Sequence, residues 1–561
     1  MTTAEQIHDL DQITPHEETR EFRYFGPPGT GKTTMLGRQI ERAAARFGIH
    51  RILVTSFSRA AAAELVGRGL SVPSQQIGTL HAHCWRALHG PRLAQDLADD
   101  WNLEHPSLAI SKGKHGRLDG GADEMSATQP GDLILQEVDR YRGLKVPYGD
   151  LWIPEARRFH DAWTAFKLER NVLDFTDLIE TALHKHPIAP GDPAVIFVDE
   201  AQDLNPLEME LIRQWGRHTE YFIVAGDDDQ LLYSFCGCKA ATLLSPLPES
   251  SIRVLAQSYR IPRAVHRVAT AWISKVRDRQ PKSYQPRDVE GAVKLAPMTY
   301  KGNTDALVHS IVAPHLDAGE SVMILGSCSY MLHPVIASLR RIGIPYHNPY
   351  RAKNGFWNPL RRTPGSASSR VLSLLAVHPD YEDARRWRLG DLRLLAEWMD
   401  GTYLQRGAKT KLLKRPVEEL SAPAEPRDLI ETFQPHILDL LLMALDGSPE
   451  DLLTWWAKAL REGDAKRSEF PLRIATERGR ATLEAPPAVI VGTIHSVKGG
   501  EADNVILFPD LSERGWEHAF TPEGLDDTRR VFYVGMTRAR QTLYLAKNVS
   551  DLAVSWAGLP L

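Results

Sequence analysis

Short runs of β-branched and other apolar residues recur along this chain, and most of them end at a charged or turn-forming residue. The clearest runs are RILVTSF from Arg51, AVIFVDE from Ala194, YFIVAGD from Tyr221, SVMILGS from Ser321, AVIVGTIH from Ala488 and NVILF from Asn504. Segments with helical periodicity lie between many of them, for example TTMLGRQIERAAARFG from Thr33. Because strands that alternate with helices build parallel sheets with crossover connections, we predict α/β architecture, and more than one such region.

The length of the chain, 561 residues, exceeds what one hydrophobic core usually supports, so we expect several domains. The α/β pattern stops between residues 357 and 487, where the sequence becomes mostly helical. The apolar residues spaced by three and four in this region are Ile430, Phe433, Ile437, Leu440 and Ala444. We interpret the region as a helical insertion.

Overall charge gives no argument for or against a nucleic-acid partner, because 67 Lys and Arg balance 71 Asp and Glu. The four cysteines are scattered and lack zinc-ligand spacing. No apolar run approaches the roughly 18 residues of a membrane span. The start, MTTAEQIHDLDQ, is polar and acidic, unlike a signal peptide. We therefore expect a cytoplasmic protein without a membrane partner.

The segment GPPGTGKT fits the phosphate-binding pattern G-x-x-x-x-G-K-[ST], in which glycines let backbone N–H groups wrap phosphate oxygens. The short strand-like FRYF precedes it and a helical pattern follows, as this motif requires. Lys32 is placed to reach the β and γ phosphates, and the Thr33 hydroxyl to bind Mg²⁺. The predicted nucleotide-binding residues here are Gly26, Pro27, Pro28, Gly29, Thr30, Gly31, Lys32, Thr33 and Thr34.

A phosphate loop of this kind needs a carboxylate at the end of a second strand to hold the metal, and an acidic segment supplies it. VIFVDEAQD places Asp199 directly after four apolar residues, with Glu200 beside it. We predict that Asp199 holds Mg²⁺ and that Glu200 orients and polarises the attacking water. A third segment, GDDDQLLYSF from Gly226 to Phe235, combines three carboxylates and an amide with two aromatic rings.

Together with GPPGTGKT, eight segments that follow it in order resemble the UvrD/Rep-type superfamily 1 DNA helicases. Besides GPPGTGKT, the matching segments are LVTSFSRAAAAEL (Leu53–Leu65), IGTLHAHCWRAL (Ile77–Leu88), DFTDLI (Asp174–Ile179), VDEAQD (Val198–Asp203), GDDDQLLYSF, LAQSYRIP (Leu255–Pro262), GTIHSVKGGEADNVIL (Gly492–Leu507) and FYVGMTRARQTLYL (Phe532–Leu545). The resemblance covers nearly the whole chain except two insertions.

The resemblance implies two RecA-like P-loop domains, parallel sheets flanked by helices, each carrying a mostly helical insertion. The first domain would comprise residues 1–84 and 166–255, with an insertion at 85–165. The second would comprise residues 256–356 and 488–561, with an insertion at 357–487. ATP would bind in the cleft between the two RecA-like domains.

The resemblance also assigns roles around the nucleotide. Gln230 would sense the γ-phosphate, and Arg260 and Arg538 would act as arginine fingers on the developing phosphoryl charge. Tyr259 would stack on adenine, and Glu501 would contact the ribose. The alternative for Tyr259 is an ordinary core aromatic.

On the nucleic-acid side, three aromatic residues would stack on the bases of single-stranded DNA, namely Phe57, Tyr233 and Phe235. The alternative for each ring is a place in a hydrophobic core. The residues expected along the DNA backbone are Thr79, His81, Thr493 and His495. The segment GDDDQLLYSF would thus face nucleotide at one end and DNA at the other.

The function implied is an ATP-dependent helicase that moves 3′ to 5′ on single-stranded DNA and unwinds duplex DNA, as a monomer or with weak self-association. Its partners would be single-stranded DNA and single/double-strand junctions, with RNA not excluded. A translocase without robust unwinding, an ATP-dependent protein remodeller and a non-catalytic clamp remain as alternatives. Gln12 is only a candidate for the family's adenine-reading glutamine, so strict preference for ATP stays open.

Overall fold

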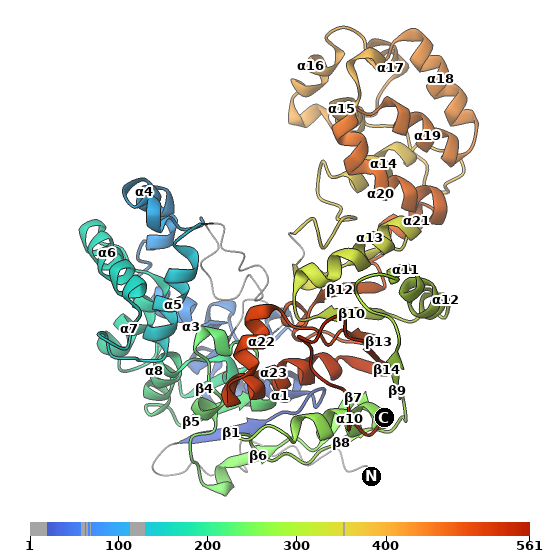
Figure 1. Cartoon of the computed structure of the whole chain (residues 1–561). Helices are drawn as coiled ribbons and strands as arrows, with labels where there is room; N and C mark the ends of the chain where they lie inside the picture. Colours follow the sequence, from blue (N-terminus) through green and yellow to red (C-terminus); the bar gives the residue numbers. More distant parts are fainter. Residues whose placement is uncertain (1–19, 58–61, 63–64, 68, 113–128, 352–353) are drawn as a thin grey trace. The chain divides into compact units, whose positions relative to one another are not determined.

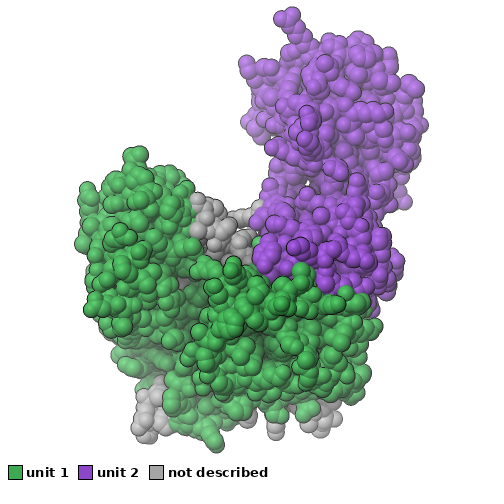
Figure 2. All heavy atoms as spheres, viewed as in Figure 1, with its two compact units in different colours: residues 1–297, 325–329, 493–561 green, residues 298–324, 330–492 purple. Residues whose placement is uncertain are grey.

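The computed structural model describes residues 20–57, 62, 65–67, 69–112, 129–351 and 354–561. The chain divides into two compact units, drawn in green and purple in Figure 2. Unit 1 comprises residues 1–297, 325–329 and 493–561, and unit 2 comprises residues 298–324 and 330–492. Each unit is described separately below.

The first part of unit 1 is a six-stranded, fully parallel sheet with the order β3-β2-β4-β5-β1-β6. Its strands are β1 Glu21–Phe25, β2 Ile52–Ser56, β3 Ile77–Thr79, β4 Val195–Asp199, β5 Tyr221–Gly226 and β6 Ile252–Val254. Its helices are α1 Lys32–Phe47, α3 Leu80–Ala87, α7 Phe175–Lys185, α8 Pro206–Gly216 and α9 Ala240–Leu243 (Figure 1). The carboxyl ends of β1, β4 and β5 share one edge, where ligands of open parallel sheets bind.

The polar sequence of β1 is accommodated by charge pairing inside the protein. Arg23 is buried, and its Nη2 lies 2.6 Å from Glu21 Oε1. Arg213 of α8 also donates to Glu21, from Nε to Oε2 at 2.9 Å. These partners let β1 run through the core although it carries two charged side chains, because a buried charge is tolerated when it is paired and hydrogen-bonded.

Between β3 and β4 lies a helical insertion with its own aromatic core. It contains α4 Ala98–Glu104, α5 Asp132–Gly143 and α6 Pro154–Arg170. Trp101 of α4 packs edge-on against Trp163 of α6, with 4.9 Å between ring centroids. Such aromatic pairs bury large apolar areas, which gives this short helical segment a core of its own.

The remainder of unit 1 is again α/β. Its strands are β7 Gln257–Pro262, β8 Gln285–Arg287, β9 Ala292–Ala296, β13 Ala502–Leu507 and β14 Ala539–Ala546. Its helices are α10 Arg263–Ile273, α22 Glu513–Ala519 and α23 Pro522–Met536. β14 pairs in parallel with β13 on one side and β9 on the other. α23 leads into β14, and Arg538 lies between them.

Unit 2 contains β11 Tyr346–His347, most of β12 Val489–Thr493, which pairs with β11 in parallel, and most of β10 Val322–Gly326. Its helices are α11 Thr304–Leu307, α12 Ala313–Asp317, α13 His333–Ile342, α14 Ala367–Leu375, α15 Leu389–Trp398, α16 Ala408–Leu413, α17 Pro426–Thr432, α18 Pro435–Asp446, α19 Pro449–Ala459, α20 Glu462–Arg478 and α21 Arg480–Glu484. The helices from α14 to α21 occupy the predicted insertion, drawn in yellow to orange in Figure 1.

The apolar spacing from Ile430 to Ala444 is not carried by one continuous helix. The structure divides it into α17 and α18, with Phe433 in an extended conformation between them. Pro435 accounts for the break, because a proline disfavours helical geometry in the residue before it, and Gln434 is accordingly non-helical (φ −58°, ψ 145°). Ile430 and Leu440 are 59% and 50% exposed, so only part of the apolar set faces a core.

The predicted α/β class with parallel sheets flanked by helices is confirmed, and each of the six apolar runs forms a strand. The four-part division at residues 84, 165, 255, 356 and 487 stays a prediction. Within the described residues, no helix is long and apolar enough to cross a membrane.

Candidate nucleotide and nucleic-acid site

The predicted phosphate loop lies between β1 and α1. Gly31 adopts φ 75° directly before α1, a left-handed conformation that glycine tolerates. The Gly26 N–H donates to the Gly226 carbonyl at 3.0 Å, which ties the start of the loop to the end of β5. Thr30 Oγ1 closes the loop by donating to the Pro27 carbonyl at 2.7 Å. The first turn of α1 therefore presents its N–H groups at this edge of the sheet, the usual arrangement for binding phosphate.

The two predicted carboxylates meet Lys32 at the end of β4. Lys32 Nζ lies 2.7 Å from Glu200 Oε1 and 3.9 Å from Asp199 Oδ1. Thr33 Oγ1 donates to Asp199 Oδ2 at 3.4 Å. Glu200 has φ 54°, a conformation that is costly for a residue with a side chain and that is found mainly at functional sites. Four of the predicted ATP-site residues are thus in mutual contact.

Burial and pairing act oppositely on these two acids. Burial raises the pKa of Asp199 to about 6, and the charge of Glu200 adds to this effect while Lys32 opposes it. Burial alone would also raise the pKa of Glu200, but Lys32 and Lys498 outweigh it and lower the pKa below its ordinary value. Glu200 is therefore held ionised beside Asp199, which is the pattern expected of two acids with different roles.

The strand β7 passes directly over the phosphate loop. The Tyr259 N–H donates to the Gly29 carbonyl at 2.8 Å, and Ser258 Oγ donates to the Pro28 carbonyl at 2.8 Å. A Cβ atom at Gly29 would lie 2.4 Å from the Cβ of Arg260, so a side chain at this position would force the two segments apart. Sequence reasoning missed Ser258, although it belongs to the QSYR motif.

The predicted adenine contact and the first predicted finger lie on this strand, and the predicted ribose contact lies directly before β13. The Tyr259 ring is 63% exposed, so its interpretation as an ordinary core aromatic is wrong. Arg260 Nε donates to Glu501 Oε2 at 2.6 Å, and Arg540 Nη1 donates to the other oxygen of Glu501 at 3.0 Å. The predicted finger and the predicted ribose contact are therefore paired with each other.

The second predicted finger contacts the predicted γ-phosphate sensor. Arg538 Nη2 donates to Gln230 Oε1 at 3.2 Å, and Gln230 Nε2 donates to Asp227 Oδ2 at 2.7 Å. The Arg538 side chain is only 1% exposed. Its other nitrogens donate to the carbonyls of Val534 and Gly500, which fixes the orientation of the guanidinium.

Two further residues, Gln202 and Lys498, complete the polar network and were missed. Gln202 Nε2 donates to Glu200 Oε2 at 2.5 Å, and Gln202 Oε1 accepts from the Asp227 N–H at 3.0 Å. Lys498 Nζ lies 3.3 Å from Glu200 Oε2 and pairs with Asp203. Burial raises the pKa of Asp203 to about 6, although Lys498 opposes this shift. Both residues belong to quoted motifs, VDEAQD and HSVKGGE, so motif membership was the available signal.

The predicted DNA-stacking rings gather on one side of this network. Tyr233 lies 4.9 Å from Phe57 and 6.0 Å from Phe235, measured between ring centroids, and Lys498 Nζ lies 5.4 Å from the Tyr233 ring. His495 packs edge-on against Phe235 at 5.9 Å. Phe57 and Tyr233 are 7% and 8% exposed, whereas Phe235 is partly exposed. Phe235 is thus the ring best placed to meet a base without rearrangement.

The remaining predicted backbone contacts have structural partners. Thr79 caps α3 by accepting from the Ala82 N–H, and Thr493 Oγ1 accepts from the Ser496 N–H at 3.2 Å. His81 lies edge-on to Phe175, at 5.8 Å between ring centroids. Their contact with DNA stays a prediction. Gln12 lies outside the described residues.

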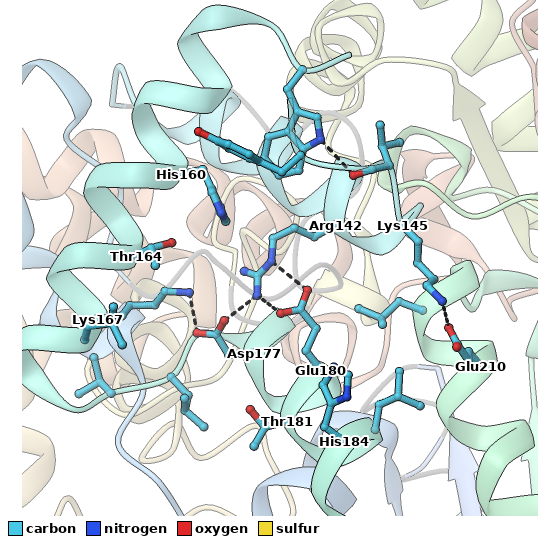
Figure 3. Close-up of a pocket in the computed structure, with 18 residues that line it drawn as sticks. Arg142, Lys145, His160, Thr164, Lys167, Asp177, Glu180, Thr181, His184 and Glu210 are labelled. Atoms are coloured by element: carbon cyan, nitrogen blue, oxygen red, sulfur yellow. Dashed lines mark hydrogen bonds and ion pairs between the residues drawn. The ribbon is translucent and has the colours of Figure 1, made fainter. Parts of the chain in front are cut away.

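A separate cavity of about 620 Å³ lies among α5, α6 and α7 (Figure 3). Figure 3 shows Arg142 between Asp177 and Glu180, with Lys167 on the other side of Asp177. Both cations also pair with Asp174, which caps α7. Since the charged groups neutralise one another, the cavity gives no sign of a charged ligand, and we interpret the network as the joint between the insertion and α7.

Two family models and several helicases are similar to this chain. The model of the AAA domain family matches residues 16–236, and the model of the UvrD-like helicase C-terminal domain matches residues 472–550. The ATP-dependent DNA helicase UvrD1 of Mycobacterium leprae is 23% identical, over 96% of this chain and 83% of its own length. Over nearly its whole length the chain is similar to UvrD-like DNA helicases.

Two Bacillus subtilis relatives are similar over most of their length to this UvrD-like chain. The putative ATP-dependent DNA helicase YjcD is 23% identical, over 96% of this chain and 78% of its own length. The ATP-dependent DNA helicase PcrA is 22% identical, over 92% of this chain and 79% of its own length. At this level of identity, the roles of individual residues rest on the geometry described above.

Proposed function

We propose that this UvrD-like protein is an ATP-dependent DNA helicase that translocates 3′ to 5′ on single-stranded DNA and unwinds duplex DNA. The observation that carries the proposal is one polar network around the phosphate loop. It runs from Lys32 through Glu200, Gln202 and Asp227 to Gln230 and then to Arg538. The loop that holds Asp227 and Gln230 continues into Tyr233 and Phe235. The groups proposed to face phosphate and those proposed to face bases are therefore only a few residues apart in the chain.

In the proposed reaction, Lys32 and the N-terminus of α1 bind the β and γ phosphates. Glu200, held ionised by Lys32 and Lys498, orients and polarises the attacking water. Gln230 senses the γ-phosphate, and Arg538 and Arg260 stabilise charge that develops on it. Tyr259, whose ring is exposed, stacks on adenine, and Glu501 binds the ribose once Arg260 has left it.

The residues present also fit a magnesium ion. Thr33 and Asp199 place a hydroxyl and a carboxylate together at the start of α1, and these oxygen ligands are the type that Mg²⁺ prefers. Burial and the charge of Glu200 raise the pKa of Asp199, although Lys32 opposes the shift. When bound, Mg²⁺ would neutralise charge on the β and γ phosphate oxygens.

On the nucleic-acid side, Phe235 stacks on a base, and Tyr233 and Phe57 support it. Stacking on a ring tolerates any base sequence, which suits a translocase. Lys498 contacts both Glu200 and the Tyr233 ring, so movement of the aromatic cluster on DNA binding would reach the hydrolytic carboxylate directly. Stacking does not distinguish sugars, so RNA remains a second candidate strand.

The test is the steady-state ATPase rate with single-stranded DNA, duplex DNA, RNA or no nucleic acid. We expect single-stranded DNA to increase the rate strongly, and labelled duplexes with a 3′ single-stranded tail to be unwound in preference to those with a 5′ tail. Equal hydrolysis in all four conditions would contradict the DNA helicase and favour an ATP-dependent protein remodeller. Preference for a 5′ tail would contradict only the direction.

Replacing Phe235 with alanine is expected to weaken the apparent affinity for single-stranded DNA by about 1 to 3 kcal/mol, because one ring that stacks on a base is lost. More DNA should then be needed to stimulate hydrolysis. Basal hydrolysis should stay unchanged, since Phe235 makes no contact with the Lys32–Arg538 network in the described residues. The measurement is ATPase rate against DNA concentration. Phe520→Ala, at an aromatic residue that is 73% exposed, is the matched control. If single-stranded DNA stimulated hydrolysis by Phe235→Ala as strongly as by the wild type, Phe235 would have only a structural role.

A further inference from the structure

A buried lysine that belongs to none of the recognised motifs lies against the three consecutive aspartates of GDDDQ. Lys282 Nζ lies 2.9 Å from Asp227 Oδ1, 2.5 Å from Asp228 Oδ1 and 2.9 Å from Asp229 Oδ2. The lysine side chain is 1% exposed, and the three aspartates are fully buried. Lys282 follows α10 in the chain, whereas the aspartates follow β5, so the contact joins segments more than 50 residues apart.

This cluster depends on Lys282 for its charge balance. Arg279 pairs with Asp229, at 2.9 Å and 2.5 Å, but it makes no such pair with the other two aspartates. Burial raises the pKa of Asp228 to about 6 even with Lys282 beside it. Burial alone would lower the pKa of Lys282, yet the three aspartates raise it above its ordinary value. Without this ammonium group, adjacent buried carboxylates would repel one another and the turn would rearrange.

The turn that Lys282 holds connects the two sides of the proposed hydrolytic site. Asp227 accepts from Gln230 through its side chain, and its N–H donates to Gln202, which in turn donates to Glu200. Gln230 accepts from Arg538. Asp227 is therefore the common support of the γ-phosphate sensor and of the residue that orients Glu200.

Lys282 also reaches the strand that carries the phosphate loop. Its Nζ lies 5.6 Å from the ring centroid of Phe25, the last residue of β1 before Gly26. β1 and β5 are neighbours in the sheet, with Phe25 opposite Gly226. One side chain thus contacts the ends of β1 and β5, two of the strands that end at the nucleotide edge of the sheet.

We propose that Lys282 is a positioning residue for ATP hydrolysis, which holds Asp227 so that Gln230 is fixed relative to Glu200 and Arg538. The inference rests on the proposed function, because it assigns to Lys282 an effect on the hydrolytic step. Lys282 touches no reacting group itself, and the inference requires its effect to pass through Asp227 to Gln230. This requirement makes the inference testable.

The first variant is Lys282→Met, which keeps the length of the side chain and removes its charge. We expect single-turnover hydrolysis with saturating single-stranded DNA to slow by about 10²-fold, the scale of a small misplacement of catalytic groups. Affinity for fluorescent ADP should change less than about twofold, because the phosphate loop stays intact. Lys301→Met, at an exposed lysine, is the control and should match the wild type.

The second comparison separates positioning from general destabilisation. In a Gln230→Ala background, adding Lys282→Met should lower the rate no further, because effects that act through one residue are not additive. If Lys282→Met does not fold, Lys282→Met/Asp228→Asn replaces it, since this pair removes one carboxylate together with the cation. It keeps the net charge of the cluster and still leaves Asp227 unanchored.

Wild-type hydrolysis in a folded Lys282 variant would overturn the inference, as would a loss of ADP binding equal to the loss of rate. A further, multiplicative loss in the Gln230→Ala background would also overturn it. Measurements on the wild-type protein distinguish failure of the proposed helicase function from failure of the role proposed for Lys282. Absence of DNA-stimulated hydrolysis in the wild type contradicts the proposed function, whereas normal hydrolysis in the variant contradicts only the role of Lys282.

Discussion

Lys32→Ala is expected to reduce DNA-stimulated ATP hydrolysis to the background rate. Lys32 is buried between Glu200 and Asp199, so its ammonium group lies where the β and γ phosphates of a nucleotide held by the loop would arrive. The substitution removes the positive charge that would bind the β and γ phosphates. It also removes one of the two lysines that keep Glu200 ionised. The measurement is kcat at saturating ATP with single-stranded DNA.

Thermal unfolding with and without ADP provides the control for Lys32→Ala. Removing a partner from a buried ion pair destabilises the fold, so the variant must be assayed below its own unfolding transition. Lys301→Ala should behave as the wild type. Turnover at the wild-type rate in folded Lys32→Ala would contradict the assignment of Gly26 to Thr33 as the phosphate loop.

Arg538→Ala is expected to lower kcat by about 10³ to 10⁵, the range for an arginine finger. Its guanidinium is buried, oriented by the carbonyls of Val534 and Gly500, and already in contact with Gln230. A group fixed in this way needs little reorganisation when charge develops on the γ-phosphate. Nucleotide affinity should be largely retained, since Arg538 contacts no residue of the phosphate loop in the described part of the chain.

The measurement for Arg538 is single-turnover hydrolysis together with ADP affinity. Arg538→Lys should remain strongly impaired, because an ammonium group cannot reproduce the planar fork that contacts Gln230 and the two carbonyls. Arg260→Ala offers a comparison, with a kcat loss of the same order but no disturbance of Gln230. If Arg538→Ala bound ADP poorly and hydrolysed ATP in proportion, its role would be in binding and not in the chemical step.

Most of the fold and the central site residues could be predicted because their signals are local. The apolar run ending at Asp199 and the glycines before Lys32 specify a strand end and a loop within a few residues. The break before Pro435 was missed, because the apolar spacing continues on both sides of the proline. A short sequence pattern therefore predicts a strand end or a loop well when that one segment forms it without distant partners.

The remainder of the site is made by contacts between distant segments. Lys282 meets Asp227 across more than 50 residues of chain, and neither its neighbours nor its spacing marks it as special. The degree to which Phe57 and Tyr233 are buried is likewise set by their packing against each other. Side-chain pairing of this kind depends on the completed fold, so the sequence pattern alone could not reveal it.

With the roles proposed for Arg260 and Glu501, the ion pair between them would make the two ends of a bound nucleotide depend on each other. One carboxylate is proposed to serve the sugar, and the guanidinium it now holds is proposed to serve the terminal phosphate. A nucleotide whose ribose engaged Glu501 would release Arg260 in the same event, while Arg540 would stay available to keep the carboxylate ionised. Binding of the ribose would then free Arg260 to act on the terminal phosphate. A free polyphosphate has no ribose, so it would leave Arg260 paired with Glu501.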